Sequence, residues 1–277
     1  MSSVAGNAAV NESLSRIVRP NSGDARRAVD AVVSSLYGTR MYKSDAQRTA
    51  VHTVMVAREP VTQLVVLPTG AGKTLTFLAP CRAGVDAARS CAFASAMGTS
   101  TVVPVGSHFA PPVTIVLTPT RAVSGTILSA ARGMAIPTGV WAQGAVRGGG
   151  ERAAALIVSD ICSAVHHLAT FRDLIRRLDQ DGRLARLVVD EVHLVPLWST
   201  FRTHLSHVRN LLSELPCPLL LLTATAPAGL VTTLLSAVGT NANRPVAVIR
   251  AESSRRSNIR YMVEPIHEPG HGSERHC

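Results

Sequence analysis

The sequence contains no long apolar run and no sign of a leader segment. Among its 277 residues, no stretch approaches the roughly 18 consecutive apolar residues of a membrane-spanning helix. The opening segment, MSSVAGNAAVNESLSRIVRP, lacks the basic stretch followed by an apolar core that marks a secretory signal peptide. We therefore expect a soluble intracellular protein with no membrane partner, nuclear if its source is eukaryotic.

Cysteine is sparse, and its spacing argues against two classes of small scaffold. None of the five cysteines stands in a CxxC pair, so neither a zinc cluster nor a disulfide framework is expected. We interpret them as buried, inert thiols at Cys81, Cys91, Cys162, Cys217 and Cys277. For the irregularly spaced histidines near the C-terminus we favour a flexible tail over a metal site.

Acidic residues are outnumbered by basic ones. Lys and Arg total 28 against 18 Asp and Glu, which gives a net charge of +10 and a pI of about 10.4. Such an excess favours polyanionic partners such as nucleic acid. The 46% hydrophobic content suffices for a sizeable core, in one large domain or two small ones.

Short apolar runs recur along the chain with helical patterns between them. Strands that alternate with helices predict βαβ crossovers, hence an α/β fold with a parallel sheet and helices on both faces. One domain of this kind would occupy about residues 40–250. The expected strands are 62–67, 113–118, 155–159, 186–190, 218–223 and 246–250.

The segments outside this pattern define the expected domain limits. Residues 1–23 are small and polar and predict a disordered N-terminal segment. The domain itself is expected over 24–263, beginning with a helix at about 24–36. Residues 90–112, rich in Ala, Ser, Gly and Pro, predict a surface insertion, and 264–277 has the composition of a linker.

The segment LVVLPTGAGKTLTF, residues 64–77, combines a strand, a glycine-rich turn and a helix start. Backbone N–H groups in such a turn cradle phosphates, Lys73 can reach the outer phosphates, and Thr74 can hold Mg²⁺. The strict pattern would place Gly where this chain has Leu67, but the order of elements still predicts a triphosphate site. Its remaining residues are Thr69, Gly70, Ala71 and Gly72.

In the segment LVVDEVH, a second predicted strand is followed by two adjacent carboxylates, Asp190 and Glu191. Burying them without a cation is costly, and both motifs should finish at the carboxyl edge of the sheet, where ligands bind. We therefore expect Asp190 to face a nucleotide-bound Mg²⁺ near Lys73 and Thr74. Glu191 would orient or deprotonate the attacking water.

The motifs LPTGAGKT, LTPTR, DEVH and LTATA, in this order, resemble motifs I, Ia, II and III of superfamily 2 helicases. They cover the first of the two RecA-like domains of such enzymes. Within the superfamily the chain is most similar to RecQ-like DNA helicases, because of three further segments: YKSDAQRTAV, HLVPLWSTFR and RRSNIRYMV. The resemblance implies an ATP-binding P-loop domain of a 3′ to 5′ DNA helicase that uses ATP and Mg²⁺.

The resemblance also implies roles for residues outside the P-loop. Gln47 would recognise adenine. The aromatic loop would bind unpaired bases by stacking, although packing of its Trp and Phe under the next helix is an open alternative. The residues of this loop are Trp198, Phe201 and Arg202.

Two further motifs are expected to link nucleic acid and nucleotide. The first motif would bind the sugar-phosphate backbone of a nucleic-acid strand. An N-cap of the following helix by Thr120 is compatible with that role. It consists of Thr118, Pro119, Thr120 and Arg121. In the second, His193 would couple the nucleotide to the LTATA segment, although a satisfied hydrogen-bonding histidine is the common alternative. The coupled residues are Thr223, Ala224 and Thr225.

Three functions remain open. The resemblance favours a DNA helicase acting on single-stranded or partly duplex nucleic acid, whereas LTPTR is closer to a DEAD- or DExH-box RNA helicase. Because only about fifteen residues follow Met262, we expect full activity to need a second RecA-like domain or a partner chain. A truncated module that binds ATP and nucleic acid without unwinding is the third possibility.

Overall fold

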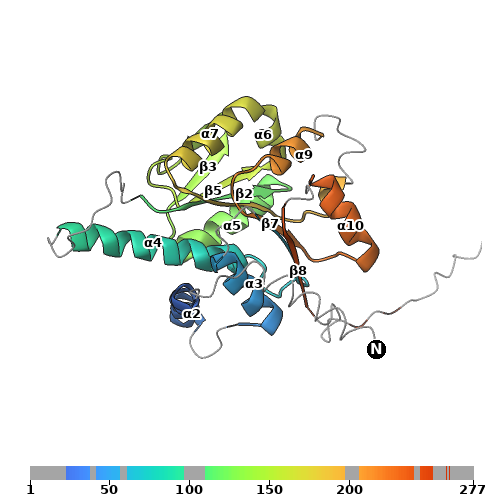
Figure 1. Cartoon of the computed structure of the whole chain (residues 1–277), viewed down its shortest axis with the longest axis horizontal. Coiled ribbons are helices and arrows are strands. Elements are labelled where there is room, and N and C mark those ends of the chain that lie inside the picture. The colour runs from blue at the N-terminus through green and yellow to red at the C-terminus, as the bar shows by residue number, and fades with distance from the viewer. Residues whose placement is uncertain are drawn as a thin grey trace, which may run out of the picture.

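The computed structural model describes residues 23–37, 42–56, 61–96, 110–196, 206–239, 244–251, 260 and 262. In this part of the chain, eight strands form one sheet in the order β4-β3-β5-β2-β6-β7-β1-β8. Figure 1 shows the sheet with helices around it. Every neighbouring pair is parallel except β3 with β4. The strands are β1 (Thr62–Val66), β2 (Val113–Thr118), β3 (Thr138–Ala142), β4 (Ala145–Arg147), β5 (Leu156–Asp160), β6 (Leu184–Val189), β7 (Leu219–Thr223) and β8 (Val246–Arg250).

All six predicted strands are present, and the α/β fold is confirmed. The apolar runs form the strands because they are buried on both faces, as β1, β2 and β7 are along their whole length. The antiparallel hairpin of β3 and β4 was not predicted. Its turn, Gln143–Gly144, has positive φ at both residues, which is the geometry of a tight hairpin turn.

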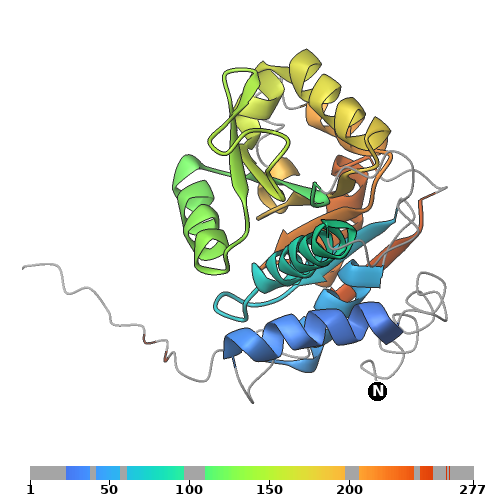
Figure 2. The same ribbon diagram turned by 90° about the vertical axis from the view of Figure 1, so that its left-hand side faces the viewer.

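Helices cover both faces of the sheet (Figures 1 and 2). One apolar core joins the sheet to α3, α4 and α5. A second joins its other face to α6, α7, α9 and α10. The helices are α3 (Asp45–Val56), α4 (Leu75–Ala96), α5 (Arg121–Gly133), α6 (Ile161–His166), α7 (Leu168–Gln180), α9 (Ser206–Ser213) and α10 (Ala228–Ala237).

Helix α2 (Gly23–Tyr37) lies outside these layers and packs against α3 and α4 (Figure 2). Its apolar stripe of Val29, Val32 and Val33 is buried against residues of the other two helices, including Leu75 at the start of α4. The predicted helix at 24–36 is therefore confirmed. Helix α2 thus forms an additional layer next to the N-terminal end of α4, which directly follows the P-loop.

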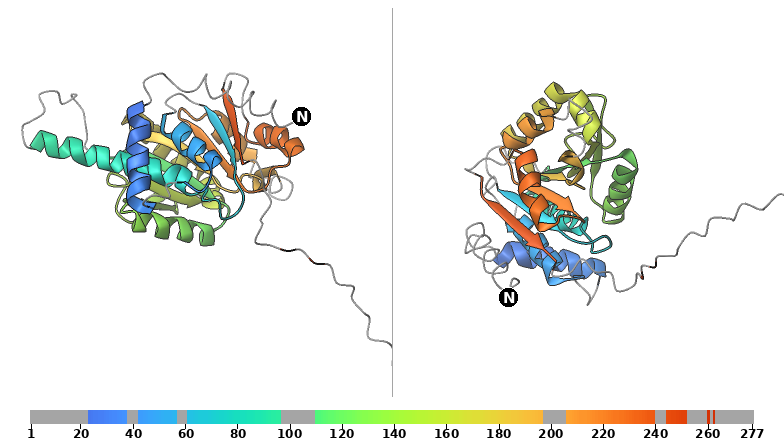
Figure 3. Two further views of the ribbon diagram at one scale, coloured as in Figure 1. Left: turned by 90° about the horizontal axis from the view of Figure 1, so that it is seen from below. Right: turned by 90° about the vertical axis from the view of Figure 1, so that its right-hand side faces the viewer.

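Helix α4 runs on beyond the edge of the sheet (Figure 3). The predicted irregular insertion at 90–112 was wrong at its beginning, because residues 90–96 continue α4. Three of these seven residues are alanine, and its high helix propensity favours the continuation. Residues 97–109, the N-terminal segment 1–22 and the tail 264–277 lie outside the described residues. No helix in the described part is long and apolar enough to cross a membrane.

Candidate active site

The turn between β1 and α4 has the backbone geometry of a phosphate-binding loop. Gly70 and Gly72 adopt φ of +84° and +79°, conformations that favour glycine. A Cβ at Gly72 would lie 2.4 Å from Nε2 of Gln47, so a side chain there would displace the Gln47 amide. The loop leads directly into α4 and therefore lies at the N-terminus of that helix, where an anion is favoured.

Lys73 lies between this loop and the carboxylates that follow β6. Its Nζ is 3.9 Å from Oε1 of Glu191 and 3.4 Å from the carbonyl oxygen of Leu67. Glu191 has φ of +48°, an unusual conformation for a residue with a side chain. Its backbone N–H donates to Oδ1 of Asp190 at 3.0 Å. The structure thus brings together the three charged residues that the two motifs contributed separately.

The electrostatics of Asp190 fit a cation site. Burial, and next the neighbouring Glu191 carboxylate, raise the pKa of Asp190, while the backbone N–H of Glu191 and the ammonium of Lys73 act in the opposite direction. One lysine therefore does not offset the cost of ionising this carboxyl. A divalent cation would supply the missing charge.

The residues available for Mg²⁺ fit a shared site rather than a cage made by the protein. Thr74 lines the cavity beside the P-loop, and Asp190 follows β6. The described residues contain no group of three or more His, Cys, Asp or Glu side chains that could hold a metal alone. Mg²⁺ commonly takes one or two protein oxygens and completes its shell with phosphate and water, which suits this pair.

The segments DEVH and LTATA are joined by direct hydrogen bonds. Nδ1 of His193 lies 3.0 Å from Oγ1 of Thr223 and 3.3 Å from Oε2 of Glu191. Thr223 also accepts from the backbone N–H of Thr225 at 3.1 Å, and its carbonyl accepts from Leu67 N at 3.1 Å. A continuous path therefore links Glu191 through His193 to Thr223 and to the start of the P-loop.

Gln47 is buried beside the P-loop with both ends of its amide engaged. Nε2 donates to the carbonyl of Gly72 at 3.0 Å, and Oε1 accepts from the backbone N–H of Lys43 at 2.7 Å. Only 1% of the residue is exposed. The predicted contact with adenine stays a prediction, since in this conformation Gln47 ties the P-loop to the segment before α3.

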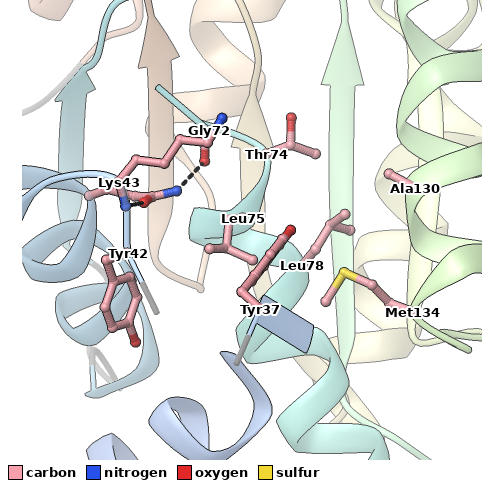
Figure 4. Close-up of a pocket in the computed structure, with 10 residues that line it drawn as sticks. Tyr37, Tyr42, Lys43, Gly72, Thr74, Leu75, Leu78, Ala130 and Met134 are labelled. Carbon is pink, nitrogen blue, oxygen red and sulfur yellow. Dashed lines mark hydrogen bonds between the residues drawn. The ribbon is translucent and has the colours of Figure 1, made fainter. Parts of the chain in front are cut away.

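A cavity of about 860 Å³ opens beside the P-loop, between α2, α3, α4 and α5 (Figure 4). Lys43, Gln47, Gly72 and Thr74 form its polar side, and apolar side chains form the rest. Such a combination of a large apolar wall and a few polar groups is typical of a site for a small molecule. The other lining residues are Tyr37, Tyr42, Leu75, Leu78, Ala130 and Met134.

The LTPTR segment lies at the carboxyl end of β2, but its residues do not share one environment. Thr118 is buried, and its hydroxyl contacts Ser124 at 2.6 Å, so this side chain is not available to a phosphate. Thr120 caps α5 by accepting from the N–H of Val123, as the alternative interpretation expected. Arg121 is 89% exposed and its Nε lies 3.7 Å from Asp160. Pro119, Thr120 and Arg121 therefore form the accessible part.

The aromatic loop, with Trp198, Phe201 and Arg202, lies outside the described residues, as does most of RRSNIRYMV. Ala224 and Thr225 follow β7, and Thr225 is exposed beside buried Ala226. Thr69 and Ala71 complete the P-loop, where Ala71 N donates to the carbonyl of Pro68.

Sequence reasoning missed three residues beside this site. Tyr42 and Lys43 line the cavity, and Nζ of Lys43 donates to the carbonyl of Gly70 at 2.8 Å. Asp30 of α2 accepts from the hydroxyl of Tyr42 at 2.6 Å. The proximity of Tyr42 and Lys43 to Gln47 in the chain was an available signal, whereas nothing local indicated Asp30.

The sequence and the fold resemble those of known helicases. The profile of the DEAD/DEAH box helicase family matches residues 44–233. The chain is similar to the DUF1998 helicase MrfA bound to DNA, with a TM-score of 0.53 and 17% identity over 84% of this chain and 30% of that chain. It is also similar to S. cerevisiae Dbp5 bound to RNA and ADP BeF3, with a TM-score of 0.52 and 15% identity over 85% and 50% of the respective chains.

These structural likenesses show the fold alone, and the chain spans half or less of either protein's length. They confirm the predicted RecA-like α/β architecture. The family profile covers most of the chain, including the P-loop, DEVH and LTATA segments. The chain belongs to the DEAD/DEAH box helicase family, as the superfamily 2 motifs predicted.

Proposed function

We propose that this chain is the ATP-binding domain of an ATP-dependent 3′ to 5′ DNA helicase of RecQ type. The observation that carries the ATPase part is the joint placement of Lys73, Glu191 and His193, with the path from Glu191 to Thr223. Such a path connects the site of hydrolysis to a segment beyond it. A glycine loop with a merely structural role would require none of these contacts.

In this mechanism the P-loop amides and Lys73 bind the β- and γ-phosphates of ATP. Thr74 and Asp190 would hold Mg²⁺, which would neutralise charge on the phosphates. Glu191 orients the attacking water and accepts its proton. Lys73, at 3.9 Å from Glu191, fixes the carboxylate relative to the loop before the nucleotide arrives.

His193 and Thr223 couple hydrolysis to movement of the nucleic acid. The His193 ring lies 3.3 Å from Glu191 and 3.0 Å from Thr223, so a change at the γ-phosphate alters both contacts. The hydroxyl of Thr223 also fixes the backbone of Thr225. A displacement at the nucleotide is thereby passed to the segment that follows β7.

The nucleic-acid surface is proposed at the carboxyl end of β2 and in the aromatic loop. Exposed Arg121 and the backbone at Thr120 suit phosphate contacts that do not read sequence. Trp198, Phe201 and Arg202 would stack unpaired bases. This loop, with Gln47 and the RRSNIRY segment, supports DNA as the substrate.

An RNA helicase is the second candidate. LTPTR supports it, and Dbp5, whose fold this domain shares, is described bound to RNA. MrfA, described bound to DNA, has the same fold, so the architecture is compatible with either nucleic acid. Full turnover is proposed to need a second RecA-like domain or partner chain that stabilises charge in the transition state. A module that only binds ATP and nucleic acid is the third candidate.

Steady-state ATP hydrolysis, with and without single-stranded DNA or RNA, tests this proposal. Glu191→Gln serves as the matched blank for contaminating ATPases. Stimulation by DNA above RNA supports the RecQ-type proposal, whereas stimulation by RNA alone contradicts it in favour of the second candidate. Binding of ATP without turnover under any condition would support the third.

A further inference from the structure

Helix α2 and the two residues before Ser44 stand outside the part of the chain that matches the helicase family, residues 44–233. Both segments nevertheless contact this region: α2 packs against the start of α4, and Lys43 contacts the P-loop itself. Val29, Val32 and Val33 of α2 pack in one buried cluster with Leu75, the first residue of α4. Leu75 also lines the cavity beside the loop.

A polar contact reinforces this packing. Oδ1 of Asp30 accepts from the hydroxyl of Tyr42 at 2.6 Å and lies 2.7 Å from Nε2 of His52. The rings of Tyr42 and His52 meet edge to face, with centroids 5.8 Å apart. Burial acts to raise the pKa of Asp30, but the hydrogen bonds from Tyr42 and His52 and the positive charges of His52 and Arg48 together lower it. Asp30 is therefore a charged acceptor at neutral pH.

From Tyr42 the contacts continue to the P-loop. Its neighbour Lys43 donates through the backbone to Gln47 Oε1 at 2.7 Å and through Nζ to the carbonyl of Gly70 at 2.8 Å. Gln47 in turn donates to the carbonyl of Gly72 at 3.0 Å. In Figure 4 the Lys43 side chain extends toward Gly72, whereas the Tyr42 ring points the opposite way.

We propose that α2 is part of the nucleotide site, and that Asp30 is a positioning residue which holds Tyr42 and Lys43 in place for the nucleoside half of ATP. The inference rests on the proposed function, because it requires ATP in this cavity. The triphosphate is bound by the loop amides and Lys73, whereas Tyr42 and Lys43 form the wall beyond the loop. Loss of Asp30 should therefore affect the nucleoside more than the phosphates.

The test compares two ligands by calorimetry in the presence of Mg²⁺: ATP and inorganic tripolyphosphate. For Asp30→Ala we expect ATP affinity to fall about tenfold, the size of one lost hydrogen bond to a charged group. Tripolyphosphate affinity should change less than about twofold. Asp30→Asn, which keeps an acceptor for the Tyr42 hydroxyl, should recover most of the ATP affinity.

Two further variants keep the test decisive. Asp173→Ala removes a carboxylate from an exposed ion pair with Arg176 and should leave both affinities unchanged. Tyr42→Phe removes the hydroxyl from the other end of the Asp30 contact and should weaken ATP in the same direction, without adding to the effect of Asp30→Ala. If Asp30→Ala does not fold, the ATP and tripolyphosphate affinities of Tyr42→Phe test the proposal in its place.

The outcomes separate this inference from the proposed function. If the wild-type chain binds tripolyphosphate and ATP but Asp30→Ala and Tyr42→Phe bind ATP equally well, the role of α2 is refuted and the nucleotide site stands. An equal loss of both ligands would also overturn it, because that indicates general loosening of the fold. A wild-type chain that binds neither ligand would refute the nucleotide site itself.

Discussion

The contact between Lys73 and Glu191 should be measurable as a coupling energy in the ligand-free protein. At 3.9 Å and an effective dielectric constant of about 20, their gross attraction is about 4 kcal/mol. The side chains are only 12% and 28% exposed, so solvent screens them incompletely, but desolvation and lost side-chain entropy offset part of the attraction. We therefore expect a net coupling of about 1 to 3 kcal/mol.

A double-mutant cycle in urea unfolding measures this quantity, with Lys73→Met, Glu191→Gln and the double variant. The matched control is the pair Arg176–Asp173, which is closer, at 2.6 Å, but 64% and 51% exposed. Its cycle, with Arg176→Met and Asp173→Asn, should give at most about 1 kcal/mol. A Lys73–Glu191 coupling no larger than the control's would refute the argument that the two motifs are preassembled before nucleotide binds.

Three further substitutions test separate parts of the site. Asp190→Asn should stabilise the ligand-free protein at neutral pH while weakening Mg²⁺-ATP binding, because burial first and Glu191 second raise the pKa of Asp190. Since the folded state then holds the proton more tightly than the unfolded one, wild-type stability falls as pH rises through this raised pKa. The stabilisation of the folded state by Asp190→Asn should shrink as pH falls toward 3.8, the usual pKa of an aspartate. A stabilisation that urea unfolding finds to be independent of pH would contradict this explanation. His193→Ala should retain basal ATP binding but lose at least part of the stimulation of hydrolysis by nucleic acid, and fully retained stimulation in the ATPase assay would exclude it from coupling. Trp198→Ala should weaken binding of a fluorescent single strand by about 1 to 3 kcal/mol without changing ATP affinity, whereas an unfolded variant would favour the alternative that this residue packs in the core.

The sheet could be predicted because most of its strands are buried on both faces and therefore appear as uninterrupted apolar runs. The β3–β4 hairpin escaped prediction for the opposite reason. β3 alternates half-buried and buried residues, β4 has only three residues, and their turn is Gln143–Gly144 rather than the usual Asn-Gly or Asp-Gly. Helix α4 also continues past residue 90, where the predicted insertion began. The residues from 90 onward contain no glycine or proline, the usual signals for a helix end, before Gly98.

The P-loop and the DEVH segment could be placed because each motif is local and both end strands at one edge of the sheet. Even the departure at Leu67 has a structural account: this side chain is fully buried in the core shared with α3, α4 and α5, so a larger residue than glycine is accommodated there. In contrast, the burial of Thr118 and the contact of Gln47 with Gly72 depend on neighbours distant in sequence. The Asp30 contact depends on how α2 packs, which no local pattern specifies.

The central claim is that the loop containing Lys73 binds a nucleoside triphosphate. Calorimetric titration of Mg²⁺-ATP into the wild-type chain and into Lys73→Ala tests it most directly. We predict saturable binding by the wild type and no detectable binding by a folded Lys73→Ala variant. Equal ATP affinity in the two proteins would contradict the assignment of this site.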